Sequence, residues 1–286
     1  MKNTTIQPDI LQKVAKGSRV ALIYHLQVRD KEAYSNWYIK STDLLKSMGG
    51  SRLFNMSVDP VPREGMFVDE IFIDEYPSAE DTLKFIAATE AELSESCQNV
   101  TILAIQPEPQ LKIRIVRVIA FLMHFFKGIY DNGTPTASWK AHNTAVWPDE
   151  KQMSVARKQD LDRPLLVYNL NKNKKIAQYQ DSPQDAKQCS GEEAYERYSK
   201  IAGAQLLRRG AYPVYGGKPL GILAGGENNM LYDNWSKFIL VYYPQRRNLL
   251  AMIEGEEFKS GQHHRDAGLD RVAIFMGNDK MSEASS

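Results

Sequence analysis

Two stretches of the chain, residues 21–27 and 165–171, share a pattern of apolar residues with polar residues set between them. Both are rich in β-branched and aromatic residues, which is typical of a buried strand. Aligned with each other, they place Tyr168 on Tyr24. Because side chains alternate across a strand, the polar positions of each copy share one face, where we expect a pocket. These polar positions are His25 and Gln27 in the first copy and Asn169 and Asn171 in the second.

The order of predicted elements also occurs twice. In the first half the periodicity predicts a strand, helix, strand, strand, helix and strand at residues 21–27, 31–48, 51–58, 66–74, 78–96 and 100–105. The order returns after Pro164, and Tyr34 precedes Gly49 by as many residues as Tyr195 precedes Gly210. This is the βαββαβ order of a ferredoxin-like unit, repeated within one chain. The sequence therefore predicts an α+β fold with repeats at residues 19–107 and 164–277.

The repeats are separated by residues 108–163, a segment too long for a simple linker. Residues 111–128 form a basic, apolar helix candidate, and a stretch richer in turn-forming residues follows. One interpretation is a connector that packs across the two repeats. The other is a lid that brings Trp139 or His142 to a pocket.

Composition narrows the class of protein. The 286 residues are 43% hydrophobic and carry a net charge of +1, so no strong overall field favours nucleic acid. Two cysteines imply no disulfide framework, and a cytoplasmic location is expected. The most hydrophobic run, residues 118–126, is shorter than the roughly 20 residues that span a bilayer, so we expect a buried or partner-facing helix and no membrane partner. The expected partner is a small-molecule ligand, and pairing of whole chains as a homodimer is left open.

With these elements in place, the second repeat resembles a family of small dimeric α/β-barrel proteins whose defining domain has no known function. The resemblance covers about residues 145 to 277. Its features are Pro164 before Asn169-Leu170, the segment 191–198, Gly210, Gly216-Gly217, Trp235, Phe238, Tyr243-Pro244, Phe258 and the segment 264–269. The first repeat looks like a diverged relative, because it lacks the His-Arg-x-Ala-Gly segment and has His25 aligned with Asn169.

The wider superfamily includes antibiotic-biosynthesis monooxygenases, lactone isomerases, EthD-like proteins and haem-handling enzymes. The resemblance implies that both ferredoxin-like repeats form an intramolecular dimeric α/β barrel. It implies no particular reaction, because one fold supports many chemistries.

Three residues are candidates for catalysis: His25, Asn169 and His264. A histidine in a strand can act as a general acid or base, and an amide can hold a carbonyl. Each also has a structural interpretation. His25 would then be a core histidine, Asn169 an amide that ties strands together, and His264 part of a helix end whose positive charge complements the helix dipole.

Candidates for substrate binding are Arg265, Trp37, Tyr195 and Trp235. Arg265 suits a carboxylate through paired hydrogen bonds, and the aromatic residues suit the walls of a pocket or simply the core. Adjacent histidines at 263 and 264 lack metal-ligand spacing, so no metal site is expected. The paired glycines match no phosphate-binding motif, and no cofactor is expected.

These observations favour a cofactor-independent enzyme that uses acid/base chemistry, of an oxygenase or isomerase type, on a small aromatic or carboxylate-bearing metabolite. The alternative is a non-catalytic small-molecule-binding or structural protein. A haem- or metal-dependent enzyme is a third hypothesis.

Overall fold

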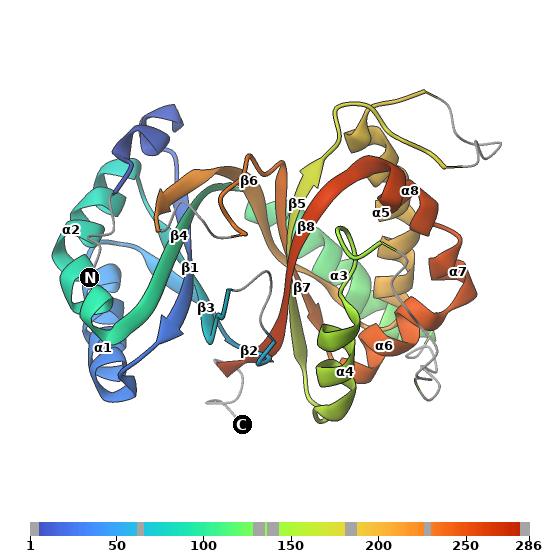
Figure 1. Ribbon diagram of the computed structural model, residues 1–286, viewed down its shortest axis with the longest axis horizontal. Coiled ribbons are helices and arrows are strands. Elements are labelled where there is room, and N and C mark those ends of the chain that lie inside the picture. Colours follow the sequence, from blue (N-terminus) through green and yellow to red (C-terminus); the bar gives the residue numbers. More distant parts are fainter. Residues whose placement is uncertain are drawn as a thin grey trace. The chain divides into compact units, whose positions relative to one another are not determined.

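The computed structural model describes residues 6–61, 66–127, 135, 143–180, 188–225 and 230–280. In the first half, a short 3₁₀ segment, η1 (Pro8–Lys13), precedes β1 (Val20–Val28), α1 (Lys31–Ser47), β2 (Ser51–Val58), β3 (Glu70–Tyr76), α2 (Ala79–Ser96) and β4 (Cys97–Pro107). Two helices follow, α3 (Gln110–Lys127) and α4 (Glu150–Lys158). The second half contains β5 (Leu165–Asn173), α5 (Gly191–Arg208), β6 (Tyr212–Ala224), β7 (Lys237–Tyr243), α6 (Arg246–Glu254), α7 (Glu256–Lys259), α8 (Gln262–Gly268) and β8 (Leu269–Asp279) (Figure 1).

The eight strands form one closed ring in the order β1-β3-β2-β8-β5-β7-β6-β4. The pairs with a defined register, such as β1 with β3 and β5 with β7, are antiparallel. The predicted α+β fold with two ferredoxin-like repeats is therefore confirmed. In the second repeat the predicted long helix is divided into α6, α7 and α8, with breaks at Gly255 and Gly261.

The chain divides into two compact units. Unit 1 comprises Met1–Pro107, Gly217–Asn234 and Gly277–Ser286, and unit 2 comprises Glu108–Gly216 and Trp235–Met276. Helices α3 and α4 therefore lie in unit 2. Among the described residues, no helix is long and apolar enough to cross a membrane.

The corresponding first helices of the repeats begin and end in the same way. Asp30 accepts hydrogen bonds from two backbone N–H groups at the start of α1, and Ser190 caps α5 in a capping box with Glu193. Gly49 and Gly210, just beyond the helix ends, have φ angles of 77° and 74°, a left-handed conformation that favours glycine. The equal spacing in the sequence thus reflects helices of nearly equal length, with 17 residues in α1 and 18 in α5.

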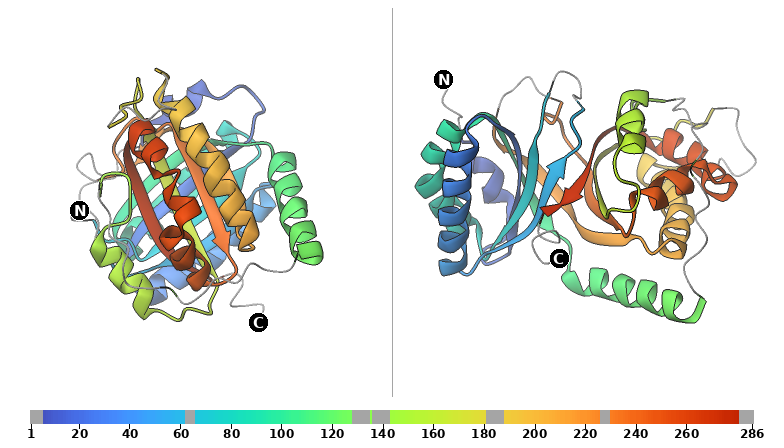
Figure 2. Two further views of the ribbon diagram at one scale, coloured as in Figure 1. Left: turned by 90° about the vertical axis from the view of Figure 1, so that its right-hand side faces the viewer. Right: turned by 90° about the horizontal axis from the view of Figure 1, so that it is seen from below.

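Each unit has a core between its strands and its own helices. In unit 1, Val20, Leu22 and Tyr24 of β1 pack with Trp37 of α1 and Phe85 of α2. In unit 2, Leu165 and Val167 of β5 pack with residues of α5, α6 and α7, which lie over one face of the strands of this unit (Figure 2).

The predicted alignment of Tyr24 with Tyr168 is wrong by one residue. Tyr24 faces the helices of unit 1, whereas Tyr168 points away from those of unit 2 and contacts Phe238 and Phe275. The strand ladders give the correct register, because Tyr76 pairs with Val20 and Tyr243 pairs with Leu165. Counted from these rungs, Tyr24 corresponds to Asn169, and His25 corresponds to Leu170. A shift of one residue moves every side chain to the other face, so His25 and Asn169 are not equivalent.

Candidate functional site

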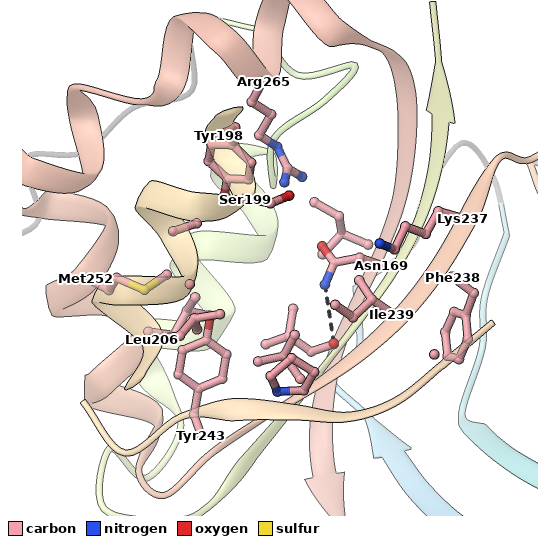
Figure 3. A pocket seen from close by; sticks show the side chains of 18 of the residues that line it. Asn169, Tyr198, Ser199, Leu206, Lys237, Phe238, Ile239, Tyr243, Met252 and Arg265 are labelled. Atoms are coloured by element: carbon pink, nitrogen blue, oxygen red, sulfur yellow. Dashed lines mark hydrogen bonds between the residues drawn. The ribbon is translucent and has the colours of Figure 1, made fainter. Parts of the chain in front are cut away.

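Unit 2 contains a cavity of about 390 Å³ between strands β5 and β7 and helices α3, α5 and α6. Its walls are mostly aliphatic and aromatic, with a few polar side chains among them (Figure 3). Lining residues labelled in the figure are Asn169, Tyr198, Ser199, Leu206, Lys237, Phe238, Ile239, Tyr243, Met252 and Arg265. A concave, largely apolar space with a few polar groups is the usual form of a small-molecule site.

The cavity occurs where unit 2 has small side chains and unit 1 has large ones. In unit 1, Tyr24 is paired with Phe72 on the ladder, and their rings stack at 4.4 Å. The corresponding rung of unit 2 pairs Asn169 with Ile239, and both line the cavity. Replacement of two stacked rings by an amide and an aliphatic side chain leaves space against the helices.

Arg265 provides a buried positive charge at this cavity. Its side chain is 4% exposed, and its terminal nitrogens point into the cavity (Figure 3). Nε donates to the carbonyl of Val146 at 2.9 Å, and the guanidinium lies 4.6 Å from the ring centre of Trp147. Within the described residues, no ion pair joins Arg265 to a carboxylate. The neighbouring Asp266 instead accepts a hydrogen bond from Trp147 Nε1 at 2.7 Å.

Unit 1 has a buried arginine with a different environment. The guanidinium of Arg52 also lies over aromatic rings, 4.2 Å from Tyr38 and 4.4 Å from Phe72. It forms two hydrogen bonds with the buried carboxylate of Asp74, at 2.8 and 2.9 Å. On the corresponding rung of unit 2, the position of Asp74 is occupied by Val241. The charge of Arg52 is therefore neutralised within the chain, whereas that of Arg265 faces open space.

Two glycines bring α8 close to α5 and so position Arg265. A Cβ added to Gly268 would lie 2.6 Å from the carbonyl oxygen of Gly191, and one added to Gly191 would lie 2.5 Å from that of Gly268. Neither position has room for a larger residue. These glycines explain the pattern in segments 191–198 and 264–269, which the resemblance singled out.

The hydroxyl groups of Tyr198 and Tyr243 are neutral over the physiological range. Burial raises the pKa of Tyr198 to about 12, although the adjacent Arg265 acts in the opposite direction. Burial also raises the pKa of Tyr243. Ser199 donates to the carbonyl of Tyr195 at 2.9 Å, and Asn169 Nδ2 donates to the carbonyl of Val167 at 3.3 Å. The cavity therefore offers the buried guanidinium of Arg265 and several neutral hydrogen-bonding groups, while the ionisable side chains of Glu108, Lys112 and Lys237 also line it.

The predicted site residues divide between the two units. Asn169, Tyr195 and Arg265 all line the cavity, so the structure brings these three together. His264 lies next to Arg265 in sequence but is not among the lining residues, and its Nδ1 lies 2.8 Å from the hydroxyl of Tyr179. Trp235 lies against the guanidinium of Arg271, at 5.3 Å, and does not line the cavity.

His25 and Trp37 belong to unit 1. Trp37 is a core residue whose Nε1 donates to the carbonyl of Thr89 at 3.0 Å. His25 is 1% exposed, and its Nδ1 lies 3.4 Å from the carbonyl of Thr101. Burial lowers the pKa of His25 to about 3, so the imidazole is neutral near pH 7. The lid candidates Trp139 and His142 lie outside the described residues.

Sequence reasoning missed several parts of the cavity. Ile113 and Val116 of α3 form one side, and Trp147 and Pro148 contribute from the segment before α4. These residues lie far from β5 in sequence, and only the fold brings them to it. Among the described residues, no cluster of three or more His, Cys, Asp or Glu side chains could hold a metal ion.

No family model matches the chain, and no curated protein matches it. Three similar solved structures are a protein of unknown function from Rhodopseudomonas palustris, a provisionally assigned monooxygenase from Lactobacillus acidophilus and a variant chlorite dismutase from Candidatus Nitrospira defluvii. The first is 22% identical over 46% of this chain and 93% of its own, with a TM-score of 0.40. The second is 11% identical over 92% of this chain and 94% of its own, with a TM-score of 0.43. The third is 9% identical over 93% of each chain, with a TM-score of 0.47.

At these identities and TM-scores the similarity assigns no activity, and the fold is defined by the closed ring of two βαββαβ repeats. The chain has a tandem dimeric α/β-barrel fold. In this barrel protein the described cavity lies between the strands of unit 2 and helices of the same unit.

Proposed function

We propose that unit 2 binds a small, apolar or aromatic molecule that carries a carboxylate, with Arg265 as its anchor. The observation that supports this most strongly is a buried guanidinium at an apolar cavity with no carboxylate paired to it in the described part of the chain. A buried charge is expensive unless it is paired and hydrogen-bonded. A ligand carboxylate would provide that partner through two parallel hydrogen bonds.

The rest of the cavity suits the apolar part of such a ligand. Ile239, Val241, Leu206 and Met252 provide aliphatic surface, and Tyr198 provides an aromatic ring. These side chains would contact a ring or a short hydrocarbon body. Ser199 is exposed and also lines the cavity, so ligand entry is proposed beside α5.

The proposed chemistry is cofactor-independent and depends on hydrogen bonds to ligand oxygens. Because burial keeps Tyr198 protonated, its hydroxyl beside Arg265 would donate a hydrogen bond to a ligand oxygen on which negative charge develops. The amide of Asn169 would hold a second ligand oxygen, as a neutral donor. Non-catalytic binding is the second candidate, and it is supported by the lack of a histidine among the described lining residues.

The described lining does not fit a haem. Protein ligands to haem iron are histidine, cysteine thiolate, methionine and tyrosine. The lining has no histidine or cysteine, and its methionines, Met252 and Met276, would need a histidine as the second ligand. Burial keeps the hydroxyls of Tyr198 and Tyr243 protonated, which does not suit them to bind iron. Haem is therefore not proposed as a cofactor of this cavity.

Native mass spectrometry of the purified chain, followed by a thermal-shift screen, tests the proposal. We expect aromatic carboxylates to raise the melting temperature, while the corresponding primary amides do not. Turnover of a hit by the unmodified chain, reduced in Tyr198→Phe, would support the enzyme. Binding without turnover would support the second candidate. A screen in which carboxylates and amides act alike would contradict the anchor role of Arg265.

A further inference from the structure

Helix α3 (Gln110–Lys127) has two apolar faces. One packs on unit 2, where Ile113 and Val116 line the cavity and Ala120 is buried. With about 100° between successive residues, the other apolar positions lie on the remaining surface of the helix. They are exposed, and Phe125 and Phe126 reach 74% and 75% exposure. The exposed apolar residues that define this outer stripe are Leu111, Ile115, Val118, Ile119, Phe121, Leu122, Phe125 and Phe126.

Basic residues border the outer stripe, and acidic residues are absent from it. Arg114 and Arg117 lie on one side and Lys112 on the other, by their helical positions. All three are exposed. No Asp or Glu occurs between residues 110 and 127. The apolar stripe therefore runs along α3, and the positive charge beside it lies in the first half of the helix, at Arg114 and Arg117, because Lys112 is paired with Glu108 at 3.2 Å.

This charge pattern distinguishes between two kinds of partner. A contiguous apolar patch on a protein surface marks an interaction site. If two copies of the chain paired through α3 in parallel, Arg114 and Arg117 of both copies would meet and repel each other. An anionic lipid surface instead offers hydrocarbon for the apolar side chains and negative headgroups for the basic ones. The bilayer is therefore the better match.

We propose that α3 binds the surface of anionic membranes, lying in the plane of the interface. Its outer stripe enters the boundary between headgroups and acyl chains, while its inner face stays on unit 2. Because Ile113 and Val116 of α3 line the cavity, binding of α3 to the membrane would hold the cavity of unit 2 next to the bilayer. The expectation of no membrane partner considered only spanning segments, and a helix that lies in the interface does not need that length.

Vesicle co-sedimentation of the full chain tests this proposal. We expect binding to vesicles of equal parts phosphatidylglycerol and phosphatidylcholine, and much weaker binding to phosphatidylcholine alone. Arg114→Gln/Arg117→Gln should lower partitioning by roughly 30-fold, since each basic residue near such a surface contributes about fivefold. Val118→Asn/Phe125→Asn should reduce binding to both vesicle types.

Matched controls lie on other helices. Lys200→Gln on α5 removes an exposed charge, and Ile39→Asn on α1 removes an exposed apolar side chain. Both should bind vesicles like the unmodified chain, and circular dichroism should show that all variants fold. Equal binding by control and α3 variants would overturn the proposal. The proposal would also be overturned if sedimentation velocity showed that the unmodified chain self-associates and that Val118→Asn/Phe125→Asn abolishes this self-association. Neither outcome affects the carboxylate test, which uses soluble ligands.

Discussion

At the scale of single residues, the two buried arginines show how the units differ. Arg52 has its counter-charge, Asp74, within the chain, and aromatic rings fill the space around it. Arg265 has similar aromatic neighbours, Trp147 and Tyr198, but its guanidinium faces a cavity. An arginine that is paired in the way of Arg52 has a structural role. An arginine without a carboxylate partner in the described chain is better explained by an anionic ligand.

His25 gives a prediction at the same scale. Its folded-state pKa of about 3 is below its ordinary value of 6.5, so the unfolded chain binds more protons between these values. His25 therefore contributes stability above pH 6.5 that is lost as the pH falls toward 3. In denaturant unfolding, the free energy of unfolding should rise with pH more steeply in the unmodified chain than in His25→Gln. The difference in slope should reach up to about 1.4 kcal/mol per pH unit. Equal slopes between pH 4 and 6 would show that the imidazole is not buried as described.

At the scale of elements, the sequence predicted which strands and helices form but not the register between the repeats. Strands β1 and β5 are buried on both faces along most of their length, so their periodicity does not define which face meets the helices. A Tyr-Pro segment occurs in both repeats, at residues 76–77 and 243–244, and aligning these two segments gives the correct register between β1 and β5. They place Asn169, rather than Tyr168, at the position of Tyr24.

The corrected register predicts how to close the cavity. Asn169→Tyr gives β5 the residue that unit 1 has on the same rung, so the new ring should occupy the space beside Ile239. Ligand binding should be lost, while the melting temperature stays within a few degrees because apolar space is filled. Leu170→Met, on the other face, is the control and should bind normally. Retained binding by Asn169→Tyr would place the ligand elsewhere.

The contact between α5 and α8 makes a second prediction for the elements. Gly268→Ala would force a Cβ against the Gly191 carbonyl, and overpacking of this kind destabilises by about 1 to 3 kcal/mol. Arg265 would move with α8, so ligand affinity should fall as well. Gly203→Ala on α5 meets nothing within 4 Å and should leave the free energy of unfolding unchanged or slightly raised. Thermal unfolding of both variants distinguishes a close helix contact from a general glycine effect.

At the scale of the whole molecule, the duplication produced two units with different interiors. The sequence predicted the fold class, the repeat and three of the lining residues, Asn169, Tyr195 and Arg265. It placed His25 with them because a misaligned strand made His25 and Asn169 seem equivalent. It could not predict the walls formed by α3 and Trp147, because nothing in a linear pattern shows which distant segments pack together.

The central claim is that Arg265 anchors a ligand carboxylate, and isothermal titration tests it most directly. An aromatic carboxylate from the screen and its primary amide are titrated into the unmodified chain, Arg265→Gln and Arg271→Gln. The control, Arg271, lies over Trp235 outside the cavity lining. Loss of a charge-assisted bond costs about 1.5 to 3 kcal/mol, so Arg265→Gln should weaken carboxylate binding by roughly 10- to 100-fold. Arg271→Gln should bind the carboxylate normally, and the amide should bind weakly throughout. Equal carboxylate affinity in the unmodified chain and Arg265→Gln would contradict the account.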